Sequence, residues 1–484
     1  MVQKNNKKND VKSFKATSAW DRLTPKDQKL LDKRCSDYLS FISQCKTERA
    51  TVEYIKAKAE KAGFKLLPAL GKGKKLKPGT KVMFINNNRA ICLGIIGKRP
   101  AEEGLRLVAA HLDVPKIDVK STPLYEKDNL ALFKTHYYGG IKKFQWVTIP
   151  LSLHIFAVDK SGKTHSFVIG EKPGDPVFTI SDIAIHLAQK MQMKRLTNEA
   201  VTGEELNILV GSKPDPETDK DKPNRIKNMV IREIEKQFGL TEEDLAWAEI
   251  HAVPAMKAAE VGFDRGLIGA YGHDDRSCVY AAYTAMSEID VPEHTAAVIF
   301  LDKEEVGSAG PNGAQSGLIV DIISMLAEAT NGKISFADSR NVITKTLVFS
   351  ADTSASIDPN YESAYDPLNS GYLGKGVWIS KFSGKGGKSG SLEVDIEFLA
   401  KIRKMLAEEN IPYQFGEMGK VDEGGGGTVA RLIANNNIQV VDMAIPTVSL
   451  HSPFEIISKA DYHYSVSAYK AFMKNHYCLV GSDD

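Results

Sequence analysis

The chain contains 484 residues, and its 63 Lys plus Arg nearly balance its 61 Asp plus Glu, which leaves a formal net charge of +2. Hydrophobic residues make up 42% of the chain and aromatic residues 8%, which is typical of a globular protein and excludes a disordered, collagen-like or coiled-coil chain. The near-neutral charge argues against nucleic-acid binding, because neutralising phosphates needs a basic excess. The length predicts about two to four domains.

Cysteine usage and the absence of long apolar stretches indicate a cytoplasmic chain. The five cysteines, at positions 35, 45, 92, 278 and 478, form no Cys-x-x-Cys pair, so we expect neither a disulfide framework nor a cysteine zinc site. The first residues, MVQKNNKKNDVKSF, are polar and basic and lack the apolar region of a secretion signal. No stretch approaches the roughly 18 consecutive apolar residues of a membrane-spanning helix, so we expect no membrane association.

The N-terminal part of the chain is predicted to be helical and then extended. Residues 1–18 are predicted to form a flexible tail. Apolar residues recur at helical spacing between Pro25 and Lys61, which predicts two helices. Residues 72–81 are rich in Gly and Lys and are predicted to form a solvated loop. The next apolar runs, VMFINNN (82–88) and AICLGIIG (90–97), are typical of two paired strands.

From residue 105 onward, short apolar runs alternate with helical patterns. This alternation is typical of an α/β sandwich in which helices cover both faces of a mixed, largely parallel sheet. The predicted strands are 105–110, 296–301, 346–351 and 438–444. The predicted helices are 277–286, 319–329, 392–409, 428–435 and 461–475.

Residues 118–252 break this rhythm. The segments WVTIPLSLHIFAV (146–158) and KTHSFVIG (163–170) are typical of antiparallel strands, and residues 211–225 form a charged, proline-bearing segment that predicts an exposed loop. We therefore predict a β-rich domain, 118–252, inserted into a first domain that is formed by residues 1–117 and 253–484.

Histidines and acidic residues directly follow several of the predicted strands. In open α/β sheets, ligands bind outside the carboxyl ends of the strands. We therefore expect one crevice to collect these side chains, with two more reaching it from loops: His111, Asp113, Glu304, Glu305 and Asp352 from strand ends, and Asp274 and His451 from loops.

Taken singly, most of these residues have simpler explanations. A histidine at a strand end is most often a hydrogen-bonded structural residue. Glu304 and Glu305 suit the start of a helix, where acidic groups favour the positive end of the dipole. Either Asp274 or Asp275 suits a helix N-cap. Asp352 needs a partner or a metal ion, because an unpaired carboxylate at a buried strand end is costly.

As a set, two histidines and several carboxylates suit Zn²⁺, Co²⁺ or Mn²⁺. Five or six such ligands exceed the needs of one tetrahedral zinc ion. An aspartate shared by two ions about 3.5–4 Å apart would use all of them, and a free glutamate beside the activated water would complete a hydrolase.

Six segments resemble the motifs of the aspartyl aminopeptidase and aminopeptidase I family of dinuclear zinc exopeptidases, and within it the bacterial aminopeptidase 1 type. The resemblance implies a zinc-exopeptidase-like αβα sandwich and a metal-dependent aminopeptidase that removes N-terminal residues from peptides. The segments occur in family order and are AAHLDVP (109–115), AYGHDDRSC (270–278), FLDKEEVGSAGPNGAQS (300–316), SADTSASIDPNY (350–361), DEGGGGTVARL (422–432) and AIPTVSLHSPFE (444–455).

Carried over residue by residue, the resemblance implies two divalent ions per subunit, most simply Zn²⁺, with Co²⁺ or Mn²⁺ as alternatives. Asp274 would bridge the two ions. His111 and Asp352 would hold one ion, and Glu305 and His451 would hold the other.

The resemblance also implies roles for residues that do not bind the ions. Glu304 would be the general base, which takes a proton from the bridging water and later delivers it to the leaving amine. Asp113 would orient His111. His186 resembles a histidine that enters the active site of a neighbouring subunit, with an ordinary helix-end histidine as the alternative. Contacts with substrate are implied for Lys381, Gly427 and Thr428.

In the family, the inserted domain drives dimerisation and dimers assemble into a tetrahedral dodecamer, so we expect self-association and peptide substrates as the partners. One departure concerns Ala355 and Asp358, which stand where many members carry histidines. A strict preference for N-terminal Asp or Glu therefore does not follow from the resemblance.

Three other functions are alternatives to the hypothesis of a metal-dependent aminopeptidase. The segment FSGKGGKSGS (382–391) could cradle a phosphate, but P-loop spacing needs glycine at position 382, which is Phe382. A non-catalytic scaffold would have lost a metal ligand or the general base, whereas the five implied ligands and Glu304 are all present in the sequence. A related dinuclear peptidase, such as a glutamyl aminopeptidase, would share the core chemistry and differ in specificity.

Overall fold

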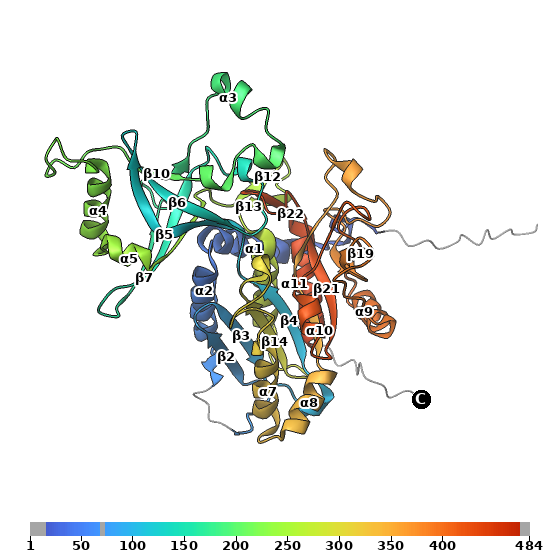
Figure 1. The fold of residues 1–484 in the computed structure, drawn as a ribbon. Helices are drawn as coiled ribbons and strands as arrows, with labels where there is room; N and C mark the ends of the chain where they lie inside the picture. Colours follow the sequence, from blue (N-terminus) through green and yellow to red (C-terminus); the bar gives the residue numbers. More distant parts are fainter. Residues whose placement is uncertain (1–15, 68–72, 475–484) are drawn as a thin grey trace, which may run out of the picture.

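The computed structural model describes residues 16–67 and 73–474 of the chain. It contains a large α/β body and a second, separate sheet with its own helices (Figure 1). Most of the predicted tail lies outside the described residues, as do the start of the predicted loop 72–81 and the last residue of the helix predicted at 461–475. No helix within the described ranges is long and apolar enough to cross a membrane.

The body is built on a mixed sheet of 13 strands. Ten of them follow one path, in the order β1 (Lys65–Leu66), β2 (Lys81–Asn86), β3 (Ala90–Ile95), β14 (Ala296–Leu301), β4 (Arg106–His111), β15 (Leu347–Ser350), β21 (Gln439–Val448), β22 (Glu455–Ser458), β13 (Leu267–Ala270) and β12 (Ala259–Val261). Three strands branch from this path near β21: β16 (Thr353–Ala355), β17 (Val377–Ser380) and β19 (Tyr413–Phe415).

The centre of this sheet is parallel, and most of the strands that flank the centre pair in an antiparallel way. Strands β14, β4, β15 and β21 run parallel to one another, while β2 and β3 form the predicted antiparallel pair. The four central strands match the runs predicted at 296–301, 105–110, 346–351 and 438–444 to within a few residues. The prediction of a mixed, largely parallel sheet is confirmed.

Helices cover both faces of the sheet. One face carries α1 (Pro25–Gln44), α2 (Glu48–Lys61), α6 (His273–Ser287), α9 (Ile396–Glu408) and α11 (Lys459–Lys474), and the other carries α7 (Leu318–Asn331), α8 (Phe336–Lys345) and α10 (Val429–Ala434). The two predicted N-terminal helices are confirmed, and the first starts at a capping box in which Thr24 and Asp27 each bind the other's backbone N–H. The helix predicted at 392–409 begins later, at Ile396, and α8 was not predicted.

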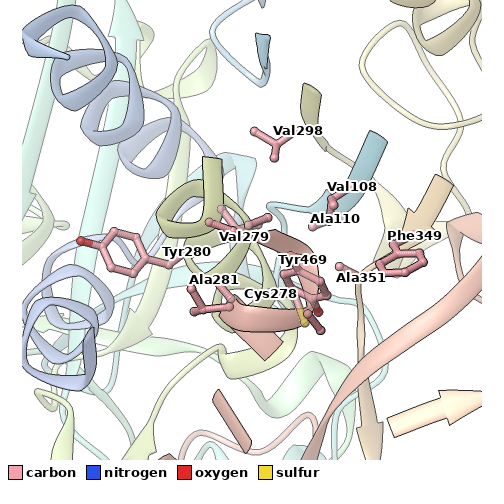
Figure 2. Packing of buried hydrophobic residues seen from close by; sticks show 14 of the residues in the cluster. Val108, Ala110, Cys278, Val279, Tyr280, Ala281, Val298, Phe349, Ala351 and Tyr469 are labelled. Carbon is pink, nitrogen blue, oxygen red and sulfur yellow. The ribbon is translucent and has the colours of Figure 1, made fainter. Parts of the chain in front are cut away.

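The sheet separates two apolar cores because successive side chains of a strand point to opposite faces. In β4, Val108 and Ala110 pack with α6 and α11, whereas Leu107 and Ala109 pack with α7 and α8. Figure 2 shows the first of these cores, where Val108 and Ala110 lie beside residues of α6 and Phe349 of β15.

The second sheet has seven antiparallel strands, in the order β8 (Thr164–Ile169), β7 (Leu151–Val158), β11 (Glu249–Pro254), β5 (Lys116–Lys127), β6 (Leu130–Tyr138), β10 (Ile208–Gly211) and β9 (Thr179–Ile180). The strands predicted within 146–158 and 163–170 are confirmed as the antiparallel pair β7 and β8. The same stretch of chain contains α3 (Ile185–Met191), α4 (Arg225–Phe238) and α5 (Glu242–Ala246). This part of the molecule has its own apolar core, and α3 stands at the top of Figure 1, apart from the sheet.

Candidate metal centre

The side chains predicted to form one crevice do converge beyond the carboxyl ends of the central strands. His111 is the last residue of β4 and pairs with Leu301, the last residue of β14, so the turn that carries Glu304 and Glu305 starts at the level of His111. Ser350 of β15 pairs with Ala109 of β4, so Asp352 and His111 both lie two residues beyond paired positions. Strand register therefore brings distant segments to one place.

Asp274 occupies the middle of the cluster, and its two carboxylate oxygens face different histidines. Asp274 Oδ1 lies 3.2 Å from His111 Nε2, and Asp274 Oδ2 lies 3.1 Å from His451 Nε2. On the first side, Asp352 Oδ1 is 3.6 Å from His111 Nε2. On the other side, Glu305 Oε2 is 3.4 Å from His451 Nε2. The cluster thus has two halves that share one aspartate.

Asp275 is a buried neighbour that the sequence did not single out as a ligand. Its Oδ2 accepts a hydrogen bond of 3.1 Å from the backbone N–H of His111. Asp274 and Asp275 have non-helical backbone angles at a kink in the first turn of α6, and among the described residues neither carboxylate accepts a hydrogen bond from an N–H group of the helix. The N-cap explanation for these two residues is therefore wrong, and the reason is that both carboxylates are turned into the cluster.

The acidic pair after β14 is not a solvated helix start. Asp113, which is 0% exposed, accepts the backbone N–H groups of both residues, at 3.0 Å for Glu304 and 3.2 Å for Glu305. The Glu305 side chain is only 5% exposed. In the described part of the chain, the Glu304 carboxylate has no hydrogen-bond or ion-pair partner.

Both histidines are held through Nδ1 by backbone carbonyls, which leaves Nε2 directed at Asp274. His111 Nδ1 donates to the carbonyl of Asp113 at 2.9 Å, and the Asp113 carboxylate is 3.5 Å away. His451 Nδ1 donates to the carbonyl of Gly140 at 2.8 Å. Asp113 therefore contacts His111 mainly through its backbone carbonyl, while its carboxylate accepts hydrogen bonds from the Glu304–Glu305 turn.

Glu455 is a second residue that the sequence reasoning missed. It is buried, and its carboxylate accepts the backbone N–H groups of Asp274, at 3.1 Å, and of His451, at 2.8 Å. It therefore ties together the two segments that form one half of the cluster. Its place inside the segment AIPTVSLHSPFE was the only available signal.

The electrostatics of the cluster are dominated by buried carboxyl groups. Burial raises the pKa of Glu304 to about 8 and the pKa of Glu455 to about 8, and it raises the pKa of Glu305 well above its ordinary value. Asp274 differs, because the imidazoles of His111 and His451 outweigh its burial and lower its pKa. So many carboxyl groups in a desolvated space call for cationic charge.

The donor set fits divalent ions. Among the described residues, two groups of three side chains place donor atoms within 4.8 Å of one another: His111, Asp274 and Glu305, and His111, Asp275 and Asp352. Asp275 Oδ1 and Glu305 Oε1 are buried without a hydrogen-bond partner in the described structure. Imidazole nitrogens with carboxylate oxygens are the ligands of zinc sites in enzymes.

The remaining residues predicted to act on substrate lie outside this cluster. His186 is exposed on α3. Lys381 is exposed just after β17, and Gly427 is exposed beside α10. Thr428 caps α10, since its hydroxyl accepts the N–H of Ala430 at 3.1 Å and donates to Asp442 at 2.6 Å.

Fold and cluster together define an α/β metallopeptidase. The family model described as Aminopeptidase I zinc metalloprotease (M18) matches residues 41–473. A probable M18 family aminopeptidase 1 of Clostridium acetobutylicum is 40% identical over 470 residues, which cover 96% of this chain and 99% of the relative. The chain therefore belongs to the M18 aminopeptidase family and is a metal-dependent aminopeptidase, a hydrolase of peptide bonds.

Solved structures agree with this assignment. The crystal structure of an M18 family aminopeptidase from Thermotoga maritima has a TM-score of 0.90 and 37% identity, and the match covers 96% of this chain and 100% of that chain. The mApe1 dodecamer of S. cerevisiae has a TM-score of 0.73 at 19% identity, over 92% of this chain and 97% of that chain, and shares the fold.

Proposed function

We propose that this aminopeptidase holds two divalent ions in the halves of the cluster and uses Glu304 as its general base. The observation that carries the proposal is the placement of Asp274, whose two oxygens face His111 and His451 at nearly equal distances of 3.2 and 3.1 Å. In this assignment, His111 and Asp352 hold one ion, Glu305 and His451 hold the other, and Asp274 bridges them. Zn²⁺ is the expected metal, since the donors are nitrogen and oxygen and the family is described as zinc metalloproteases.

When bound, such a pair of ions lowers the pKa of a bridging water and polarises the substrate carbonyl. Glu304 is placed to receive the proton that the attacking water loses, because its carboxylate has no partner in the described structure and its backbone is fixed by Asp113. After the C–N bond breaks, Glu304 returns this proton to the nitrogen of the leaving peptide. Proton transfer by a positioned carboxyl group is worth about 10²–10⁴-fold in rate.

A test separates the base from the ligands. In Glu304→Gln, turnover of an aminoacyl fluorogenic substrate should fall by about 10²–10⁴-fold, while metal analysis should still find about two ions per subunit, as the bridged geometry requires. Glu397→Gln, an exposed position on α9, is the matched control and should behave as wild type. Wild-type turnover in Glu304→Gln would remove the base assignment.

We further propose that residues 118–252 form the surface for self-association in a cytoplasmic enzyme. Helix α3 carries exposed apolar side chains, among them Leu187, which is 67% exposed, and Met191, which is 58% exposed. A surface of this kind marks a protein–protein contact. The dodecamer seen for S. cerevisiae mApe1 is the model for the assembly, and His186, next to Leu187, is then the candidate to reach the site of a second copy. Cys35, Cys45, Cys92 and Cys278 are all free, which fits a reducing compartment.

Lys381 and the glycine-rich segment that ends at Gly427 and Thr428 are the candidate contacts for the peptide. The segment 382–391 lies between β17 and α9, but it contains β18 (Gly384–Lys385), which pairs with β20 (Gly425–Gly426), so strand and helix are not joined by one uninterrupted loop as in a P-loop. A screen of aminoacyl substrates, with and without chelator, tests metal need and residue preference together.

A further inference from the structure

One strand end of the second sheet lies directly behind both halves of the metal centre. Strand β6 ends at Tyr138, and the next two residues are Gly139 and Gly140. We call Tyr138–Gly140 the β6 end. We propose that the β6 end is a positioning element for His451 directly and for His111 through Asp113, so that the second sheet sets metal affinity in addition to any role in assembly. This inference rests on the proposed metal centre.

The first contact is made by Tyr138. Its hydroxyl donates to Asp113 Oδ2 at 2.7 Å, and Asp113 is fully buried. The same carboxylate accepts the N–H groups of Glu304 and Glu305. Because all of these donors converge on one carboxylate, its orientation fixes where the Glu304–Glu305 turn begins. Removing the hydroxyl leaves a buried carboxylate oxygen with one fewer donor, which is costly.

The second contact is made by the main chain of Gly140. A carbonyl oxygen only accepts, so the bond of 2.8 Å requires His451 to carry its proton on Nδ1. Nε2 is then the nitrogen left to bind a metal ion once the imidazole is neutral, and it faces Asp274 at 3.1 Å and Glu305 at 3.4 Å. The β6 end thus selects the tautomer in which His451 can bind a metal ion through Nε2.

The close approach of the β6 end depends on its two glycines. A Cβ atom on Gly139 would lie 3.4 Å from the Cβ of Glu305, and one on Gly140 would lie 3.4 Å from Nδ1 of His451. Gly139 also has a φ of +75°, which favours glycine. The backbone therefore packs directly against one ligand on each of two neighbouring segments.

Partners behind metal ligands typically contribute about 10–100-fold to metal affinity. The first test is Tyr138→Phe, with Tyr137→Phe as the matched control, since Tyr137 is the adjacent and partly exposed tyrosine of the same strand. Zinc affinity is measured by competition with a chromophoric chelator. Tyr138→Phe should bind zinc about 10–100-fold more weakly at unchanged stoichiometry, and Tyr137→Phe should match wild type.

The outcomes separate the two proposals. If the wild type fails to bind two zinc ions, the proposed metal centre is wrong. If the wild type binds two ions and Tyr138→Phe binds them within about twofold of its affinity, the positioning role is wrong, whatever happens to thermal stability. A purely structural role for the hydroxyl would lower the melting temperature of the metal-free protein and leave zinc affinity unchanged.

A second variant addresses His451 alone. The φ of Gly140 lies outside the left-handed region, so Gly140→Ala is compatible with the backbone, and its methyl group would lie 3.4 Å from Nδ1 of the imidazole, at the near limit of van der Waals contact. We expect one of the two zinc ions to lose about tenfold or more in affinity while the other is retained. Gly317→Ala is the control, because the nearest atom to its Cβ would be 3.7 Å away. Equal affinity of both ions in Gly140→Ala and wild type would overturn the assignment for His451.

Discussion

Arg89 lies beneath the turn that carries Glu304 and joins three carboxylates. Its guanidinium donates through Nε to Asp302 at 2.7 Å and through Nη2 to Glu48 at 2.5 Å. A third carboxylate, Glu249 of the second sheet, lies 2.8 Å from Nη1. Asp302 is 0% exposed and Glu48 is 1% exposed at the side chain, so Arg89 pairs with two fully buried anions.

Replacing Arg89 by Met should destabilise the protein by about 3–5 kcal/mol, which is the cost of leaving a buried charge uncompensated. Glu48 loses less, because Lys116 Nζ still donates to it at 2.8 Å. In the described structure, Asp302 keeps one side-chain hydrogen bond, from the backbone N–H of Lys303 at 2.9 Å, and burial already raises its pKa. Most of the loss therefore arises at Asp302.

The assay is urea unfolding followed by tryptophan fluorescence, in the presence of excess zinc. Arg265→Met is the control, because its pair with Glu260 is 3.4 Å long and Arg265 is 75% exposed, so it should cost at most about 1 kcal/mol. The double variant Arg89→Met/Asp302→Asn should be less destabilised than the two single changes added together. Strict additivity, or a loss below about 1 kcal/mol in Arg89→Met, would refute the assignment of a buried charge network.

Three further predictions test other parts of the structure. Asp274→Ala should lose both ions in metal analysis, because each carboxylate oxygen serves a different half of the cluster; retention of two tightly bound ions would refute bridging. His186→Ala should lower turnover with metal content unchanged. The control is His136→Ala, which changes an exposed histidine of the second sheet and should keep wild-type turnover. Identical kinetics in the two variants would contradict a role for His186. Burial and the charge of Arg34 lower the pKa of His463 from 6.5 to about 4, so the histidine is neutral in the folded protein at neutral pH, and its stability contribution is complete above pH 6.5 and is lost as the pH falls towards 4. As the pH falls from 6.5 to 4, the free energy of unfolding measured by chemical denaturation should decrease by up to about 3 kcal/mol less in His463→Gln than in wild type. Parallel pH profiles of the two proteins would show that His463 does not contribute.

The positions of the metal-binding candidates could be predicted because they depend on strand ends. Apolar runs identified β4, β14 and β15 almost to the residue, and the chemistry-bearing side chains follow these runs directly. Parallel strands end at a common edge of the sheet, so the sequence pattern alone predicts that His111, Glu305 and Asp352 lie close together. His451 lies on a loop, whereas Asp274, expected on a loop, lies in the first turn of α6. Strand ends do not position these two residues, and the resemblance to a family is what gave each of them a role as a ligand.

The contacts behind the ligands could not be predicted in the same way. Glu455 acts through hydrogen bonds to two backbone N–H groups, and Gly140 acts through its carbonyl oxygen. Every residue carries these backbone groups, so no residue type signals their use. Tyr138 belongs to a strand of the second sheet, and its distance from the site in the chain hid its contact with Asp113. The unpredicted α8 shows the same limit for local structure, since this 10-residue helix has two buried residues, Val342 and Ile343, and therefore a very short apolar pattern.

The arrangement explains why the two sheets are joined where they are. Asp113 follows β4, the central strand of the body, and β5 begins only three residues later, at Lys116, in the second sheet. Lys116 itself donates to Glu48 of the body at 2.8 Å. The chain therefore leaves the metal centre, forms the β5–β6 pair of the second sheet, and returns at Gly140 to hold His451. A displacement of the second sheet relative to the body would move Asp113 and the His451 carbonyl partner together, which ties the geometry of both halves of the centre to this single junction.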